Sequence, residues 1–202
     1  MKRKIAAVLA AMLLMTCSGC SFFRAWKTDF VAGTVESGVY TSEFAGLSYT
    51  PPEGWSLVER EQAMEKLKLP EENFAEPGKT YRRYTTLCEM YAMPDHADGS
   101  SVYILVDNLA GHTGGKDMTE DQYLQQLCAP QAGKDEANLT YGEPFNVVVA
   151  GQTFRAVESD VSGLGFWQRY YVRRIGSSMY VIVTIDINQP NQEAFTACFS
   201  ML

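Results

Sequence analysis

The chain has 202 residues, of which 46% are hydrophobic and 12% aromatic, enough apolar content for one core of ordinary size. Its 24 Asp and Glu residues outnumber its 17 Lys and Arg residues, which gives a net charge of −7 at pH 7. This acidic balance argues against binding to nucleic acid and against electrostatic adhesion to anionic lipid. We therefore expect one globular domain whose partners belong to other classes.

The amino terminus has the layout of a secretion signal. Three basic residues follow Met1, an uncharged apolar run covers Ile5–Met15, and small residues come next. A bilayer requires about 20 apolar residues, so this shorter run is typical of a signal that is cleaved. We expect residues 1–19 to be removed, which would leave 14 basic against 24 acidic residues.

The end of this signal, Ser18-Gly19-Cys20, resembles the lipobox of bacterial lipoproteins. The resemblance implies a lipidated Cys20, carrying a diacylglyceryl group and a fatty acid such as palmitate, and a domain anchored by lipid alone at the extracytoplasmic face of the cell membrane. Cys17 stands where the family usually has Leu, and it is the less favoured alternative site. A redox role for the two cysteines is disfavoured because they straddle the cleavage point.

Residues 20–37 show no sustained period and are interpreted as a tether, so that the single domain covers 38–202. Within it, Val39–Thr50 predicts a hairpin with its turn near Gly46, because apolar and polar residues alternate on both sides. A short helix is expected around Ala63–Leu67, ended by Pro70.

The middle of the chain predicts a second hairpin and a helix. Tyr81–Met93 and Ser101–Leu109 are rich in Tyr, Thr, Val and Ile, and the segment between them contains several turn residues. Thr119 with Gln122 has the spacing of a capping box, which predicts a helix that ends before Pro130.

From Phe145 onward the pattern indicates consecutive strands joined by short glycine turns, as in an antiparallel meander. The predicted strands are Phe145–Val149, Gln152–Val161, Phe166–Ile175 and Met179–Ile187. The last of them is apolar on both faces over part of its length, so we expect it at the centre of the sheet. An amphipathic helix is expected to end the chain, with Phe195, Cys198, Phe199 and Leu202 on its apolar face. The predicted class is α+β, a mostly antiparallel sheet flanked by helices.

One segment carries a family resemblance. The sequence from Gly46 to Trp55, GLSYTPPEGW, is similar to the opening motif of Mog1/PsbP-like domains, and the order of the predicted elements after it is similar too. The resemblance implies an α/β/α sandwich that serves as a binding or accessory module beside membrane complexes. It supplies no catalytic or ligand residues for this chain.

The candidate chemistry is sparse. His96 and His112 fall in predicted loops, and the mature sequence has no GxSxG, HExxH or paired CxxC motif. We therefore predict no cofactor, no metal and no enzymatic activity. Cys88, Cys128 and Cys198 are an odd number, which leaves two alternatives: three free thiols, or one disulfide and one leftover thiol.

A candidate partner-binding stripe lies on one predicted strand, where Trp167, Arg169, Tyr171 and Arg173 recur at every second position and would share a face. The alternative is a structural ladder, in which these residues pair with Glu89 or Glu158 and cover the sheet itself. The favoured function is a non-enzymatic binding or accessory module for a cell-envelope protein. A small-ligand receptor of a transport system is the alternative, and an uncharacterised enzyme comes third.

Overall fold

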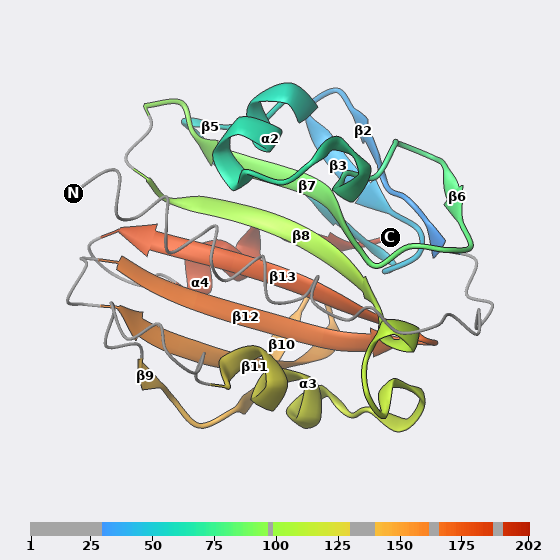
Figure 1. Ribbon diagram of the computed structural model, residues 1–202. Helices are drawn as coiled ribbons and strands as arrows, with labels where there is room; N and C mark the ends of the chain where they lie inside the picture. Colours follow the sequence, from blue (N-terminus) through green and yellow to red (C-terminus); the bar gives the residue numbers. More distant parts are fainter. Residues whose placement is uncertain (1–29, 97–98, 130–139, 162–165, 188–191) are drawn as a thin grey trace.

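The computed structural model describes residues 30–96, 99–129, 140–161, 166–187 and 192–202 (Figure 1). Cys20, the signal peptide and most of the expected tether lie outside these ranges, as does the Gly163-Leu164-Gly165 turn. No helix in the described ranges is long and apolar enough to cross a membrane.

A large antiparallel sheet forms the middle layer (Figure 1). Its strands, in spatial order, are β10 (Phe145–Val149), β11 (Gln152–Val161), β12 (Phe166–Ile175), β13 (Ser178–Ile187), β8 (Ser101–Asn108), β7 (Thr86–Pro94) and β5 (Trp55–Leu57), with β9 (Thr140–Tyr141) also paired to β11. The predicted meander is confirmed, and β13 lies between β12 and β8 at the centre.

Different layers cover the two faces of this sheet. Helices α2 (Arg60–Leu67) and α3 (Glu120–Cys128) pack on one face. On the other face lie the short helix α4 (Gln192–Ala197) and a second sheet, whose strands in spatial order are β14 (Phe199–Met201), β4 (Leu47–Tyr49), β3 (Val39–Ser42) and β2 (Thr34–Glu36). The coarse α+β class is confirmed, although a sheet, and not only helices, covers one face.

Strand β13 shows why both faces must be covered. Val181 and Val183 face the helices, while Tyr180 and Ile182 face the second sheet, and all four are at most 2% exposed. Alternate residues of a strand point to opposite faces, so a strand that is apolar at every position requires a layer on each side.

Part of the expected tether belongs to the described fold. Residues 30–36, interpreted as part of the tether, form β1 (Phe30–Val31), which pairs with β6 (Thr80–Tyr81), and β2, which pairs with β3. Phe30 is fully buried and its ring contacts those of Phe44 and Tyr84. Strands of two or three residues are too short to show a period, so only the tertiary contacts reveal them.

The carboxyl-terminal helix is shorter than expected. It ends at Ala197, and the chain continues as β14, in which Phe199 lies opposite Tyr49 of β4. The rings of Phe195 and Phe199 still pack against each other, with centroids 5.1 Å apart, so the apolar spacing is satisfied across the end of the helix. Leu202, expected on the buried face, is 58% exposed.

Of two further expectations, one predicted strand is corrected and the capping box is confirmed. The predicted strand Tyr81–Met93 is split into β6, which pairs with β1 in a separate two-stranded sheet, and β7, which belongs to the large sheet. The capping box is confirmed, since Gln122 N donates to Thr119 Oγ1 at 3.2 Å and Thr119 N donates to Gln122 Oε1 at 2.9 Å. Three short 3₁₀ helices complete the described fold: η1 (Glu71–Asn73), η2 (Leu109–Gly111) and η3 (Gly115–Asp117).

The position of Phe30 gives a direct test of where the domain begins. Phe30→Ala removes a fully buried ring and should lower the free energy of unfolding by about 3 to 5 kcal/mol in urea denaturation. Val31→Ala is the control, because Val31 is 39% exposed and should cost less than about 1 kcal/mol. Equal effects of the two substitutions would mean that this segment is a tether after all.

Candidate functional site

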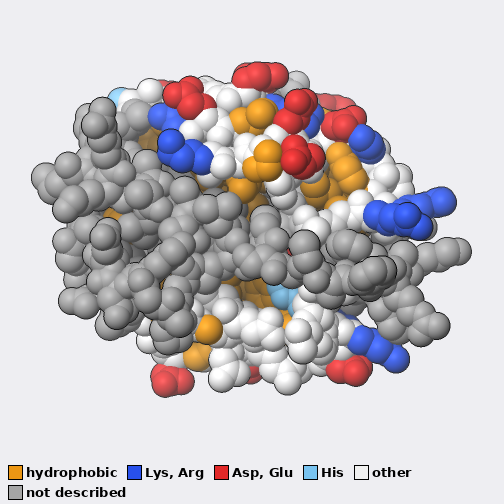
Figure 2. Space-filling model, in the orientation of Figure 1, with side chains coloured by type: hydrophobic (Ala, Val, Ile, Leu, Met, Phe, Trp, Pro, Cys, Tyr) orange, Lys and Arg blue, Asp and Glu red, His pale blue; other side chains and the backbone are white. Residues whose placement is uncertain are grey.

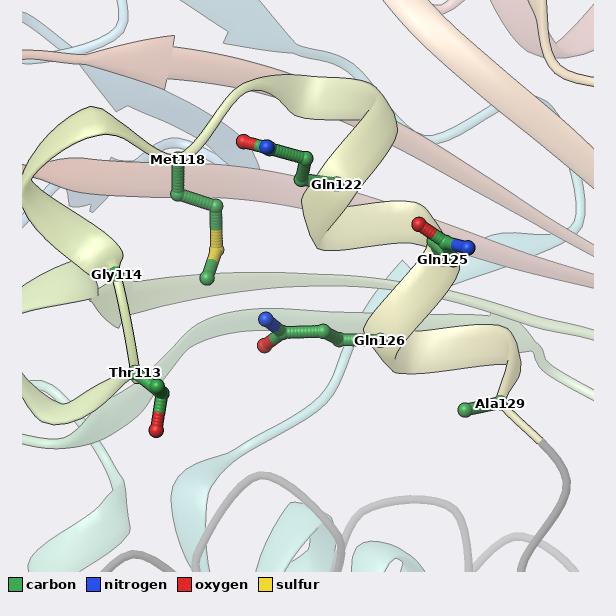
Figure 3. Close-up of a pocket in the computed structure, with 7 residues that line it drawn as sticks. All are labelled: Thr113, Gly114, Met118, Gln122, Gln125, Gln126 and Ala129. Carbon is green, nitrogen blue, oxygen red and sulfur yellow. The ribbon is translucent and has the colours of Figure 1, made fainter.

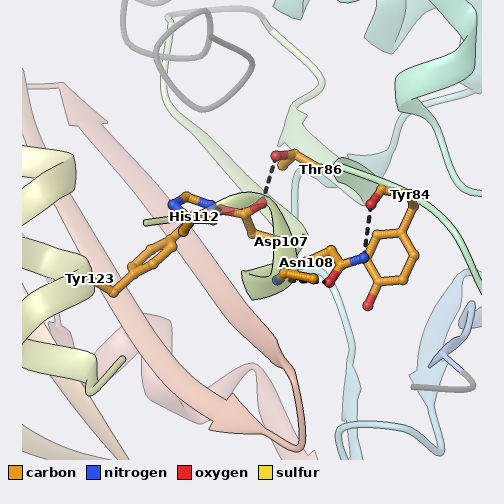
Figure 4. A network of polar contacts seen from close by, with 7 residues as sticks. Tyr84, Thr86, Asp107, Asn108, His112 and Tyr123 are labelled. Carbon is orange, nitrogen blue, oxygen red and sulfur yellow. Dashed lines mark hydrogen bonds and ion pairs between the residues drawn. The ribbon is translucent and has the colours of Figure 1, made fainter. Parts of the chain in front are cut away.

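A buried carboxyl group, that of Asp107, lies at the end of β8 and accepts hydrogen bonds from three side chains (Figure 4). Thr86 Oγ1 donates to Oδ1 at 2.9 Å, while His112 Nε2 at 2.7 Å and Tyr123 Oη at 2.9 Å both reach Oδ2. A buried acidic group is stable only when such donors replace its hydration. Asp107 therefore links the start of β7, the loop after η2 and helix α3.

Local geometry brings these donors together. Thr86 lies directly opposite Asp107 in the pairing of β7 and β8. His112 reaches back to Asp107 because the chain turns sharply after η2, and a Cβ on Gly115 would lie 1.6 Å from the Leu109 carbonyl oxygen. Only glycine therefore permits this close approach of η3 to η2. Tyr123 is on the face of α3 that packs on the sheet.

The environment of His112 favours its charged form. The hydrogen bond to Asp107 raises the pKa of His112, burial of the ring opposes the shift, and a hydrogen bond with the Gln126 side chain adds to it. The imidazole also lies beside the ring of Tyr123 on α3, with centroids 5.8 Å apart, so the loop packs against this helix.

A surface pocket of about 370 Å³ lies beside this network, between the loop and α3 (Figure 3). Its lining residues are Thr113, Gly114, Met118, Gln122, Gln125, Gln126 and Ala129. Thr113 and Gly114 directly follow His112, and Gln126 lies one helical turn after Tyr123. The contacts of Asp107 therefore hold both walls of the pocket.

The pocket lining has amide, hydroxyl and apolar groups but no charged side chain among the residues described. Charges gather elsewhere: acidic side chains predominate over α2 and the turn that follows it (Figure 2), where the exposed residues include Glu61, Glu65 and Glu72. The pocket is thus suited to hydrogen bonding with a neutral ligand.

A second buried polar group, Glu89, lies on the opposite face of the large sheet, at a bulge in β7. Its Oε1 accepts a hydrogen bond from Gly33 N at 2.7 Å, and its buried Oε2 has no partner in the described part of the chain. Burial raises the pKa of Glu89 to about 7, opposed by the Gly33 amide and the Tyr40 hydroxyl. This carboxyl group lies where β7 meets the strands β1 to β3.

The candidate partner-binding stripe has internal contacts. Trp167, Arg169, Tyr171 and Arg173 share a face of β12, the one that points to the second sheet and α4. Arg169 is 4% exposed and pairs with Glu158, and Tyr171 is fully buried with its ring stacked on Phe195. These contacts correspond to the ladder alternative, and a partner-binding role of the stripe remains a hypothesis.

Arg173 continues the same pattern at the end of the stripe. It donates from Nη2 to the Ala45 carbonyl oxygen at 2.6 Å and lies over the Phe154 ring. Because Ala45 lies between β3 and β4, Arg173 fastens the second sheet to the large one. The pair of Arg169 and Glu158, by contrast, lies within the large sheet.

The remaining candidate groups are His96 and the three cysteines. His96 is exposed next to Asp95. Cys88, Cys128 and Cys198 are free thiols, as in the first of the two alternatives. Burial raises the pKa of both Cys88 and Cys128 to about 12, which disfavours the reactive thiolate. The described ranges contain no group of three or more His, Cys, Asp or Glu residues arranged for a metal.

Comparison with known proteins found no matching family model and no matching curated protein.

Sequence reasoning singled out His112 but missed its partner Asp107. The available signal was an acidic residue at the end of an otherwise apolar strand, a position that usually demands nearby donors.

The raised pKa of Glu89 predicts a pH-dependent effect of Glu89→Gln. In the folded chain Glu89 holds its proton up to about pH 7, above its ordinary value of 4.5, so the wild type loses stability as the pH rises between these values. Glu89→Gln should therefore raise the melting temperature relative to wild type by several degrees at pH 8, and by much less at pH 4.5.

Differential scanning fluorimetry across this pH range provides the measurement, with the exposed Glu53→Gln as control. A melting-temperature difference for Glu89→Gln that stays constant with pH would refute a raised Glu89 pKa.

Proposed function

We propose that this chain is a lipid-anchored domain at the extracytoplasmic face of the cell membrane, acting as a binding or accessory module for a cell-envelope protein. The signal pattern and the lipobox ending in Cys20 support the location. The acidic surface supports a domain held by lipid rather than by charge. The resemblance of Gly46–Trp55 to Mog1/PsbP-like domains supports an accessory role.

The observation that supports a protein as the partner is the unpaired edge of the large sheet at β10. Val149 faces Gln152 across the turn formed by Ala150 and Gly151, both at positive φ. In such a two-residue hairpin the two residues that flank the turn are hydrogen-bonded to each other. Along the strand, residues whose backbone groups bond to the partner strand then alternate with residues whose backbone groups point away from it. The backbone N–H and C=O groups of Asn146 and Val148 therefore point away from β11.

This edge lacks the usual protection. Natural sheet edges carry charges, proline or bulges that prevent pairing with another chain. Strand β10 itself contains no charged side chain and no proline, with Pro144 placed just before it; its register is regular, and Val148 is 60% exposed. Within the described ranges, β10 pairs only with β11. An extended, apolar segment of a partner protein can add here as a further strand.

A second candidate function is a small-ligand receptor, which the pocket between the η2–η3 loop and α3 favours. Its volume is at the lower end of the range for ligand sites, and its polar groups converge from two elements. The two functions use different surfaces, so tests can separate them.

The lipid anchor is tested by Cys20→Ser. The variant should move from the membrane pellet to the soluble fraction after expression in a bacterium that processes lipoproteins, because acyl chains alone are proposed to hold the domain. Cys17→Ser is the matched control and should stay in the pellet. A Cys20→Ser protein that remains membrane-bound would exclude this anchor.

The β10 edge is tested by Val148→Lys, which places a charge where the partner strand would pack. Capture of envelope proteins from detergent-solubilised membranes should fall severalfold relative to wild type. Val35→Lys is the control, because Val35 is also an exposed valine on an edge strand, in the second sheet. Unchanged capture by Val148→Lys, or equal losses in both variants, would contradict strand addition at β10.

A further inference from the structure

The pocket between the η2–η3 loop and α3 combines neutral hydrogen-bonding groups with apolar ones. Gln125 and Gln126 each offer an amide that can donate and accept, and Thr113 offers a hydroxyl. Gln122 has its Oε1 occupied by the Thr119 amide, so its NH₂ group is left as a donor. Met118 supplies an apolar surface beside these groups.

The pocket offers no counter-charge to an ionic ligand. Among the described lining residues there is no Asp, Glu, Lys or Arg, and the Nε2 of the nearby His112 is already hydrogen-bonded to Asp107. A carboxylate, phosphate or ammonium group entering the pocket would lose hydration without gaining an opposite charge. A ligand with hydroxyl or amide groups would exchange water for equivalent hydrogen bonds.

The walls of the pocket are held in place before any ligand arrives. Asp107 accepts from His112 on the loop and from Tyr123 on α3, and Gln126 lies one turn after Tyr123. Gln126 thus lines a wall that these contacts fix, and its amide can both donate to and accept from a ligand. Preorganised groups lose little freedom on binding.

From these features we infer that the pocket binds a neutral saccharide, whose hydroxyls meet the glutamine amides and Thr113 while a C–H face of the ring rests on Met118. The volume of about 370 Å³ suits a mono- or disaccharide. This inference assigns a ligand class to the receptor function and is independent of the β10 edge.

The test uses the full-length lipoprotein, purified in a detergent without a sugar headgroup, and saturation-transfer difference NMR. The probes are glucose, N-acetylglucosamine, maltose and diacetylchitobiose, with glucuronate and glucosamine as charged analogues. At least one neutral probe should bind at millimolar concentration or better, and both charged analogues should bind about tenfold more weakly than the neutral probe.

Gln126→Leu should weaken binding of that probe about tenfold, because it removes an amide while keeping a similar volume. Gln62→Leu is the matched control, since Gln62 is exposed on α2 away from the pocket, and it should leave binding within about twofold. Absence of binding by all four neutral probes, preference for a charged analogue, or equal effects of the two variants would overturn the inference. None of these results would alter partner capture through β10, so a failure here is distinguishable from a failure there.

Discussion

The interaction on which the site depends is the burial of the Asp107 carboxyl group at the end of β8. Burying a carboxyl group is costly unless it is hydrogen-bonded, and within the described ranges three side-chain donors, Thr86, His112 and Tyr123, offset that cost. Each donor belongs to a different element, so the chain can bury Asp107 only by fixing those elements relative to one another. The strand β7, the η2–η3 loop and α3 are thereby placed, and with them both walls of the pocket.

On the opposite face of the sheet, other polar groups hold the covering layer in place. Glu89 accepts a hydrogen bond from the Gly33 amide, and Arg173 donates to the Ala45 carbonyl oxygen, so that both contacts join the second layer to the large sheet. The polar groups on both faces respond to pH in the same direction. The raised pKa of His112 means that its contribution is complete below its ordinary value near 6.5 and is lost as the pH rises through the folded-state value. The raised pKa of Glu89 likewise favours the folded state at lower pH.

The local parts of the fold were predictable from the sequence, because strands β10 to β13 carry their own alternation and turns, and α3 carries its capping box. The strands at residues 30–36 were missed, since their stability comes from the burial of Phe30 by distant rings. The terminal segment was assigned to a helix because the spacing of Phe195 and Phe199 fits both a helix and a strand. The strand forms because the edge of β4 is free to pair with it. The site was missed for the same reason: residues 86, 107, 112 and 123 meet only after the sheet has formed.

The most direct test of this account is an NMR titration of the His112 imidazole in wild type and in Asp107→Asn. The chain contains only two histidines, so His96→Gln assigns the second signal. Burial alone would lower the pKa of an imidazole, whereas a hydrogen-bonded acidic partner raises it, and the sign of the shift therefore separates the two cases. The account predicts a His112 pKa above 6.5 in wild type that falls below this value in Asp107→Asn. A wild-type value at or below 6.5, or one that the substitution leaves unchanged, would contradict it.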